Sequence, residues 1–79
     1  MKLSEIVNVK ELVERKVKSL VTFRGVPVGT VGTIQRQTES ISGREEILVE
    51  WDIGNGHKVS DWFSRDGYHD EFKFLELMP

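Results

Sequence analysis

The sequence predicts a mainly β protein, a five-stranded and partly open barrel preceded by a short amino-terminal helix. Three observations lead to this fold class. Short apolar runs separated by glycines and polar turns begin near residue 20, residues 46–52 alternate apolar and polar side chains, and Asn55-Gly56 stands between two such runs. Asn-Gly is a strong hairpin signal because both residues tolerate a positive φ. We therefore expect an all-β body over residues 20–77.

The helix is predicted over residues 1–18. Ser4 is a candidate N-cap, and apolar side chains recur at intervals of three and four residues, at Ile6, Val9, Val13 and Val17 or Leu12. A later start near Asn8, with Glu11 completing a capping box, is the alternative. In either case the apolar stripe predicts that the helix packs against the barrel.

The predicted strands follow in order along the rest of the chain. They cover residues 20–23, 30–37, 46–52, 58–64 and 72–77. Gly32 is expected at a bend or bulge of the second strand, and Pro27 with its flanking glycines keeps residues 24–29 in a loop. Residues 38–44 form a polar loop, and a turn or a single 3₁₀ turn precedes the last strand.

This order of elements resembles the SH3-like small barrels. The segment VGTVGTI (28–34) is similar to the G-x-V-G-T-V strand of KOW-type modules, in which a glycine permits tight curvature. The resemblance covers one short motif and the strand order of residues 20–77. It implies a fold that hosts protein, peptide, RNA and redox-partner binding, so it leaves the function open.

Length and composition indicate one soluble domain, expected in the cytoplasm. Seventy-nine residues are too few for two separate cores. No apolar run approaches the roughly 18 residues of a membrane span, and the first residues lack the pattern of a signal peptide. The charge is uneven: residues 1–36 carry seven Lys or Arg and three Glu, whereas residues 37–79 carry four Lys or Arg and ten acidic residues. An acidic second half makes nucleic acid a less favoured partner.

The residue types do not predict catalysis, a cofactor or a metal site. The chain has no cysteine, and His57 and His69 lack the close spacing of metal-ligand pairs. Strand alternation puts His57 and Asp61 on one face and Ser60 on the other, which excludes a triad from these three. The glycines at 25, 29 and 32 do not have the spacing of a phosphate-binding loop.

The aromatic residues carry the functional hypothesis. Trp51 shares a face with Ile47 and Val49 and is expected in the core. If Val59 and Phe63 point inward, Trp62 lies on a polar face, where it is exposed to a partner. The alternatives are that the helix or the 38–44 loop covers it, or that a bulge at Asp61 turns it inward. An exposed tryptophan is a typical anchor of a protein interface.

Three functions remain open at this stage. The first is a non-catalytic protein-binding or adaptor module whose partner carries basic residues. Its surface consists of Trp62, Tyr68, Asp61, Asp66 and Asp70. The second is a KOW-like nucleic-acid-binding module that uses Lys16, Lys18, Arg24, Arg36 and Arg44. The third is an accessory subunit of a larger assembly that docks through the helix or through residues 72–77. The sequence does not predict an oligomeric state.

Overall fold

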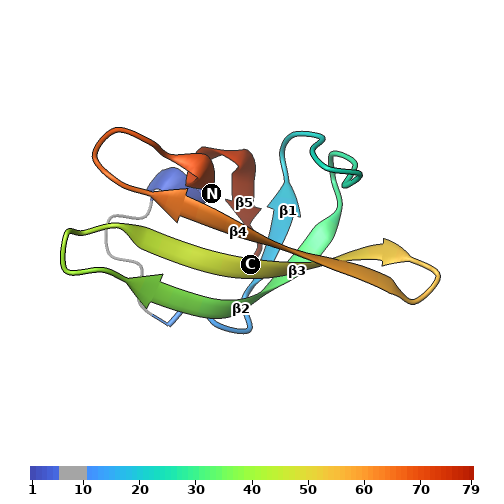
Figure 1. Cartoon of the computed structure of the whole chain (residues 1–79). Helices are drawn as coiled ribbons and strands as arrows, with labels where there is room; N and C mark the ends of the chain where they lie inside the picture. Colours follow the sequence, from blue (N-terminus) through green and yellow to red (C-terminus); the bar gives the residue numbers. More distant parts are fainter. Residues whose placement is uncertain (6–10) are drawn as a thin grey trace.

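The computed structural model describes residues 1–5 and 11–79 and shows a sheet of five antiparallel strands with two short 3₁₀ turns (Figure 1). In chain order the elements are η1 (Leu3–Glu5), β1 (Lys16–Ser19), β2 (Val31–Glu39), β3 (Glu45–Gly54), β4 (His57–Arg65), η2 (Glu71–Phe74) and β5 (Leu75–Leu77). The strand order is β4-β3-β2-β1-β5, and the sheet is not closed. The predicted mainly β class is confirmed, and the sheet is compatible with a small barrel-like fold.

β3 and β4 form the hairpin predicted from the Asn-Gly pair. Asn55 has a φ of 54° and Gly56 a φ of 74°, the left-handed conformations that a tight hairpin turn requires. The two strands pair along their length, with Ile47 opposite Phe63 and Trp51 opposite Val59. Residues 52–58 are exposed, and this end of the hairpin projects beyond the rest of the sheet (Figure 1).

The predicted amino-terminal helix is wrong for the residues that the structure describes. Residues 3–5 form only the single turn η1, Glu11 and Glu14 have positive φ values of 58° and 73°, and β1 begins at Lys16. Val17 pairs with β2 on one side and with β5 on the other. A helix at this position would lack these two strand pairings. The predicted positions Ile6, Asn8 and Val9 lie outside the described residues.

The first and last strands also differ from their predicted ranges. β1 lies at residues 16–19, and residues 20–23 instead turn away to an isolated bridge between Phe23 and Val26. Only the second half of the predicted strand 72–77 is extended. The Asp70 carboxylate accepts a hydrogen bond from the Phe72 amide, and this N-cap starts η2 in place of the strand.

The core lies on the inner face of the sheet. It contains Leu3, Leu12, Val17, Val26, Ile34, Ile47, Val49, Trp51, Phe63, Phe72 and Leu75. The predicted burial of Trp51 and Phe63 is confirmed, and Phe23 packs edge-on against both rings at centroid distances of 5.6 and 5.4 Å. Aromatic pairs favour this edge-to-face geometry. Residues 20–24 are thereby held against β4.

Gly32 has a different role from the predicted bend or bulge. It pairs regularly with Val17 and with Trp51, and the irregularity of β2 falls between Ile34 and Arg36. A Cβ atom at Gly32 would lie 2.7 Å from Cε3 of Trp51. The glycine therefore makes room for the indole ring in the core.

Candidate partner-binding surface

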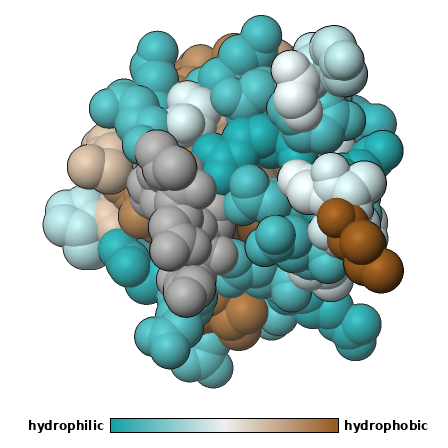
Figure 2. All heavy atoms as spheres, turned by 90° about the vertical axis from the view of Figure 1, so that its left-hand side faces the viewer, coloured by the Kyte–Doolittle hydropathy of each residue, from teal (hydrophilic) through white to brown (hydrophobic). Residues whose placement is uncertain are grey.

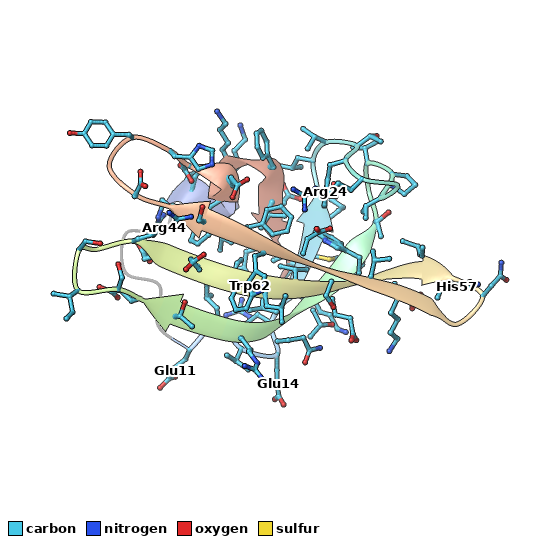
Figure 3. All side chains as sticks on the ribbon, viewed as in Figure 1. Glu11, Glu14, Arg24, Arg44, His57 and Trp62 are labelled. Carbon is cyan, nitrogen blue, oxygen red and sulfur yellow. The ribbon has the colours of Figure 1, made fainter. Side chains whose placement is uncertain are left out.

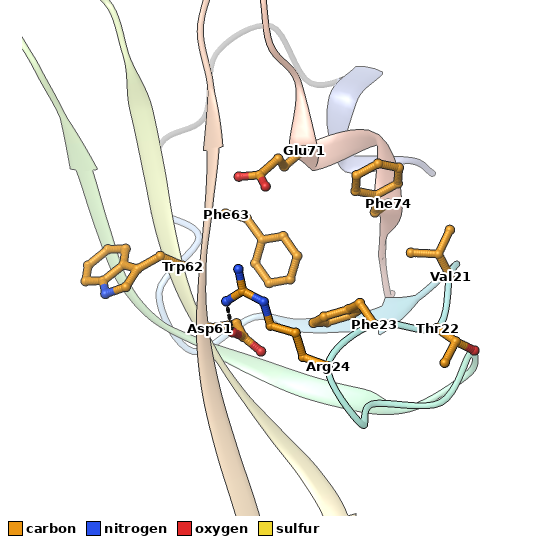
Figure 4. A pocket seen from close by; sticks show the side chains of 9 residues that line it. All are labelled: Val21, Thr22, Phe23, Arg24, Asp61, Trp62, Phe63, Glu71 and Phe74. Carbon is orange, nitrogen blue, oxygen red and sulfur yellow. Dashed lines mark hydrogen bonds and ion pairs between the residues drawn. The ribbon is translucent and has the colours of Figure 1, made fainter.

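Trp62 stands on the outer face of the sheet. Trp62 is 47% exposed as a residue, whereas Phe63 next to it is 5% exposed, so the predicted division of the two rings between opposite faces is confirmed. Figure 4 shows the two rings on opposite sides of β4. Trp62 lies directly across from Leu48, and Leu48 lies across from Arg36, which makes a row over three strands.

Two glutamates flank this row on β3. Glu46 pairs with Ser64 and Glu50 with Ser60, one position of the same face to either side of Leu48 and Trp62. Each has a cation nearby, Arg44 Nη2 at 3.9 Å from Glu46 and Lys58 Nζ at 3.6 Å from Glu50. The predicted aromatic and acidic surface thus has Leu48, Glu46 and Glu50 as neighbours of the tryptophan, which the sequence reasoning missed.

A groove opens on the opposite side of β4, where the 20–24 segment and η2 approach the strand (Figure 4). It has a volume of about 370 Å³ and is lined by Val21, Thr22, Phe23, Arg24, Asp61, Trp62, Phe63, Glu71 and Phe74. The Trp62 ring points away from the groove in Figure 4, so Trp62 borders it through its main chain. The groove therefore has an aromatic floor and runs along the edge of a strand.

Asp61 belongs to this groove and faces away from the Trp62 ring. Its carboxylate accepts a hydrogen bond from Arg24 Nη1 at 2.9 Å. The aspartate side chain is only 13% exposed, whereas the Arg24 side chain is 78% exposed. Arg24 thus covers the carboxylate from the solvent side, and a partner cation reaches Asp61 only by displacing the exposed Arg24 side chain.

Glu71 marks the other end of the groove. Its Oε1 atom accepts hydrogen bonds from the amide of Ser64 at 2.9 Å and from Ser64 Oγ at 3.1 Å. His69 Nε2 lies 3.6 Å from the second carboxylate oxygen. Glu71 therefore ties η2 to β4 and places a second carboxylate at the groove.

The other predicted surface residues lie in the turn after β4. Asp66 accepts hydrogen bonds from the amides of Tyr68 and His69, at 2.8 and 2.9 Å. The Tyr68 amide is the main reason that the pKa of Asp66 lies below its ordinary value. Asp70 caps η2, and the Tyr68 ring is fully exposed. The Asp66 carboxylate thus binds the backbone of the turn, and the Asp70 carboxylate binds that of η2. The end of the molecule that bears this turn is largely hydrophilic (Figure 2).

Of the five residues predicted for nucleic acid, Lys16 and Lys18 lie on β1, Arg36 lies on β2, and Arg24 and Arg44 lie in two different loops. Arg24 and Arg44 are well separated in Figure 3. Lys18, Arg24 and Arg44 each lie within 4 Å of a carboxylate, and Lys16 Nζ donates to Thr33 Oγ1 at 2.7 Å. Arg36 is exposed on the outer face. A second hollow beside Lys16 also contains Lys58, Glu50 and Asp52, so its charges balance.

The two histidines occupy different parts of the fold. His57 lies at the turn of the β3–β4 hairpin (Figure 3), and His69 lies in the turn before η2. Outside residues 6–10, no three metal-ligating side chains come together. The described part of the chain also contains no helix with the length and apolar character of a membrane span.

Comparison of the chain with known protein families, curated proteins and solved structures gave no match.

Proposed function

We propose that this chain is a non-catalytic protein-binding module of the SH3-like barrel type. The observation that carries the proposal is an open, aromatic-floored groove directly beside an exposed tryptophan. The SH3-like assignment is supported by five antiparallel strands and a one-turn helix before the last of them. We define the binding surface as the groove residues Phe23, Phe63, Phe74, Asp61 and Glu71 together with Trp62.

The groove suits side chains of a partner better than a small polar ligand. Three phenylalanine rings line it, and about 370 Å³ is enough for one or two large apolar side chains. Aromatic residues in such places dominate the binding energy of many interfaces. Trp62 adds a second apolar contact on the other side of the same strand.

The charge of the surface favours a basic partner. Asp61 and Glu71 face the groove, and because Arg24 pairs with Asp61 and not with Glu71, the three side chains together carry one net negative charge. On the outer face, Glu46 and Glu50 flank Trp62 and lie near Arg44 and Lys58. These acidic groups mainly set the rate of association and its salt dependence. Asp66, Tyr68 and Asp70 lie in a separate turn, and we leave them out of the proposed surface.

Selection from a random peptide library, followed by NMR of the labelled protein, tests this function. We expect selected peptides to contain apolar and basic residues and to shift the amides of residues 21–24, 60–64 and 71–74. Trp62→Ala should weaken binding by about 2 kcal/mol, roughly 30-fold, if the ring is an interface anchor. Ile41→Ala removes another exposed apolar side chain, in the 40–44 loop, and should leave binding unchanged. Peptides that shift only other regions, or a selection that yields no binder, would contradict the proposal.

A further inference from the structure

β4 is an edge strand whose outward main-chain groups lie beside the groove. It is the first strand in the order β4-β3-β2-β1-β5, so only β3 pairs with it in the sheet. In an antiparallel pair, consecutive residues direct their N–H and C=O groups alternately toward the partner strand and away from it. The amide of Ser64 bonds to Glu71 and therefore points away from β3. Trp62 and Ser60 precede Ser64 by two and four residues, so their N–H and C=O groups also point away from β3, to the free edge.

These groups are available for pairing. Among residues 1–5 and 11–79, no loop backbone and no side chain is hydrogen-bonded to the amide of Ser60 or Trp62. Glu71 occupies the amide of Ser64 and so limits the free edge at that end. A free row of donors and acceptors beside an apolar groove is the arrangement that receives an added strand.

We propose that an extended segment of a basic partner protein binds as a sixth strand along the free edge of β4. The inference rests on the proposed function and specifies how the partner is held. Main-chain hydrogen bonds form to Ser60 and Trp62, and alternate side chains of the segment enter the groove between Phe23 and Phe74. The remaining side chains lie on the outer face, where they contact the Trp62 ring.

The spacing of β4 specifies the pattern of the bound segment. Phe63 and Asp61 face the groove two residues apart, one apolar and one acidic. Because strand side chains alternate with a period of two, a bound strand also presents groove-facing residues two positions apart. An apolar residue matches Phe63, and a lysine or arginine matches Asp61 by displacing the exposed Arg24 side chain from its carboxylate. The expected pattern is apolar-x-basic, read in either direction.

A second copy of this chain does not fit the edge. The inward side chains of its own β4 include Phe63, which is 5% exposed in the core and cannot fill a neighbour's groove. The register that pairs Ser60 with Trp62 of the other copy would also place the two Asp61 side chains opposite each other. Like charges directly opposite are destabilising.

The experiment compares Ser60→Pro with Ser60→Ala. Proline removes the outward N–H at a position where edge strands tolerate it, and alanine removes only the hydroxyl. The probe is a nine-residue peptide, threonine throughout except for a central leucine and a lysine two positions later. Fluorescence anisotropy measures its affinity, and thermal unfolding shows whether each variant is folded. Ser60→Pro should weaken binding about tenfold or more, and Ser60→Ala should bind as the unmodified chain does.

A second measurement uses the unmodified protein, so it does not depend on the folding of a variant. In the bound peptide, the amides that face β4 alternate with amides that point away from it. N-methylation of the two amides that face Ser60 and Trp62 should weaken binding about tenfold or more. N-methylation of the amides that point away should change the affinity less than threefold. Changing the lysine to glutamate should also weaken binding.

Three results would each overturn one part of the inference: the strand pairing, the apolar-x-basic pattern or the identity of the occupant. If library peptides bind the surface but are insensitive to Ser60→Pro and to N-methylation, the partner binds without strand pairing and the proposed function stands. If library peptides bind and the leucine–lysine peptide does not, the apolar-x-basic pattern is wrong. If the chain associates with itself and Ser60→Pro abolishes this, the occupant of the edge is a second copy.

Discussion

Replacing Gly32 with alanine tests how tightly Trp51 is packed onto β2. The new methyl group would lie 2.7 Å from Trp51 Cε3, 2.7 Å from Val49 Cγ1 and 2.9 Å from the carbonyl oxygen of Glu50. Carbon atoms in favourable contact are about 3.5–4.0 Å apart, so all three neighbours have to move. The Glu50 oxygen belongs to the backbone of β3, and its displacement shifts the strand itself.

The expected loss of stability follows from two opposing effects. Overpacking costs about 1–3 kcal/mol, and the backbone contact puts Gly32→Ala at the upper end of this range. Alanine also reduces the freedom of the unfolded chain, which offsets about 0.4–1 kcal/mol. We expect the free energy of unfolding to fall by about 2 kcal/mol, which lowers the melting temperature by roughly 8–16 °C in a domain of this size.

Urea denaturation followed by circular dichroism measures this loss, with Gly67→Ala as the matched control. A Cβ atom at Gly67 meets no heavy atom within 4 Å, and its φ lies outside the left-handed region. The control should therefore be as stable as the original chain or up to about 1 kcal/mol more stable. If the two variants differed by less than about 0.5 kcal/mol, the tight contact between Gly32 and Trp51 would be refuted.

Three further predictions concern the hairpin, the two faces of β4 and the turn that follows it. Phe63→Ala should lower the free energy of unfolding by about 3–5 kcal/mol and Trp62→Ala by less than half of that, because only Phe63 is in the core; similar losses in urea denaturation would contradict the assignment of faces. Gly56→Ala should cost about 1–2 kcal/mol because its φ is 74°, and an unchanged melting temperature would argue against the left-handed turn. The pKa of Asp66 lies below 3.8 because the Tyr68 amide donates to its carboxylate. The stabilising contribution of the ionised carboxylate is therefore fully present above the ordinary carboxyl pKa, and it is lost as the pH falls through the lowered pKa of Asp66. An NMR titration that places the pKa of Asp66 at or above 3.8 would disprove this.

The strand pairing of the amino-terminal segment could not be read from its local pattern. Val13 and Val17 fit a helical spacing of four as well as the two-residue spacing of a strand. The choice depends on β2 and on β5, which pairs Val17 with Leu77 at the other end of the sequence. Strand pairing between distant segments overrides local propensity. A window of fifteen residues around Val17 does not include its strand partners, so it cannot predict the pairing.

The faces of β3 and β4 were predictable, and so in part was their register. A two-residue turn pairs Gly54 with His57, and unbroken pairing from there would place Trp62 opposite the inward residue Val49. An irregularity between Asp52 and Gly54 shifts the register, and Trp62 comes to lie opposite Leu48. A one-residue slip in pairing places inward side chains of one strand opposite outward side chains of the other. Because the apolar and polar residues of β3 and β4 alternate, matching their inward faces already required such a shift.

The groove could not be predicted from the sequence. It forms where Arg24 meets Asp61, 37 positions later, and where η2 reaches back to β4. Asp61 and Trp62 are neighbours in the sequence, yet strand geometry places their side chains on opposite faces. Proximity along the chain therefore says little about which acidic residues share a surface with the tryptophan.

The pairing of β1 with β5 also bears on the order in which the chain folds. Val17 and Leu77 pair near the two ends of the chain, and the amide of Leu77 donates to the carbonyl of Met1. The β3–β4 hairpin closes across two residues, whereas β1 and β5 close across most of the sequence and lose more loop entropy in doing so. We expect the hairpin to be formed in the folding transition state and β5 to join afterwards. Substitutions at Leu75 would then speed unfolding and leave the folding rate almost unchanged. During synthesis, the outer edge of β1 stays unpaired until Leu75–Leu77 have been made.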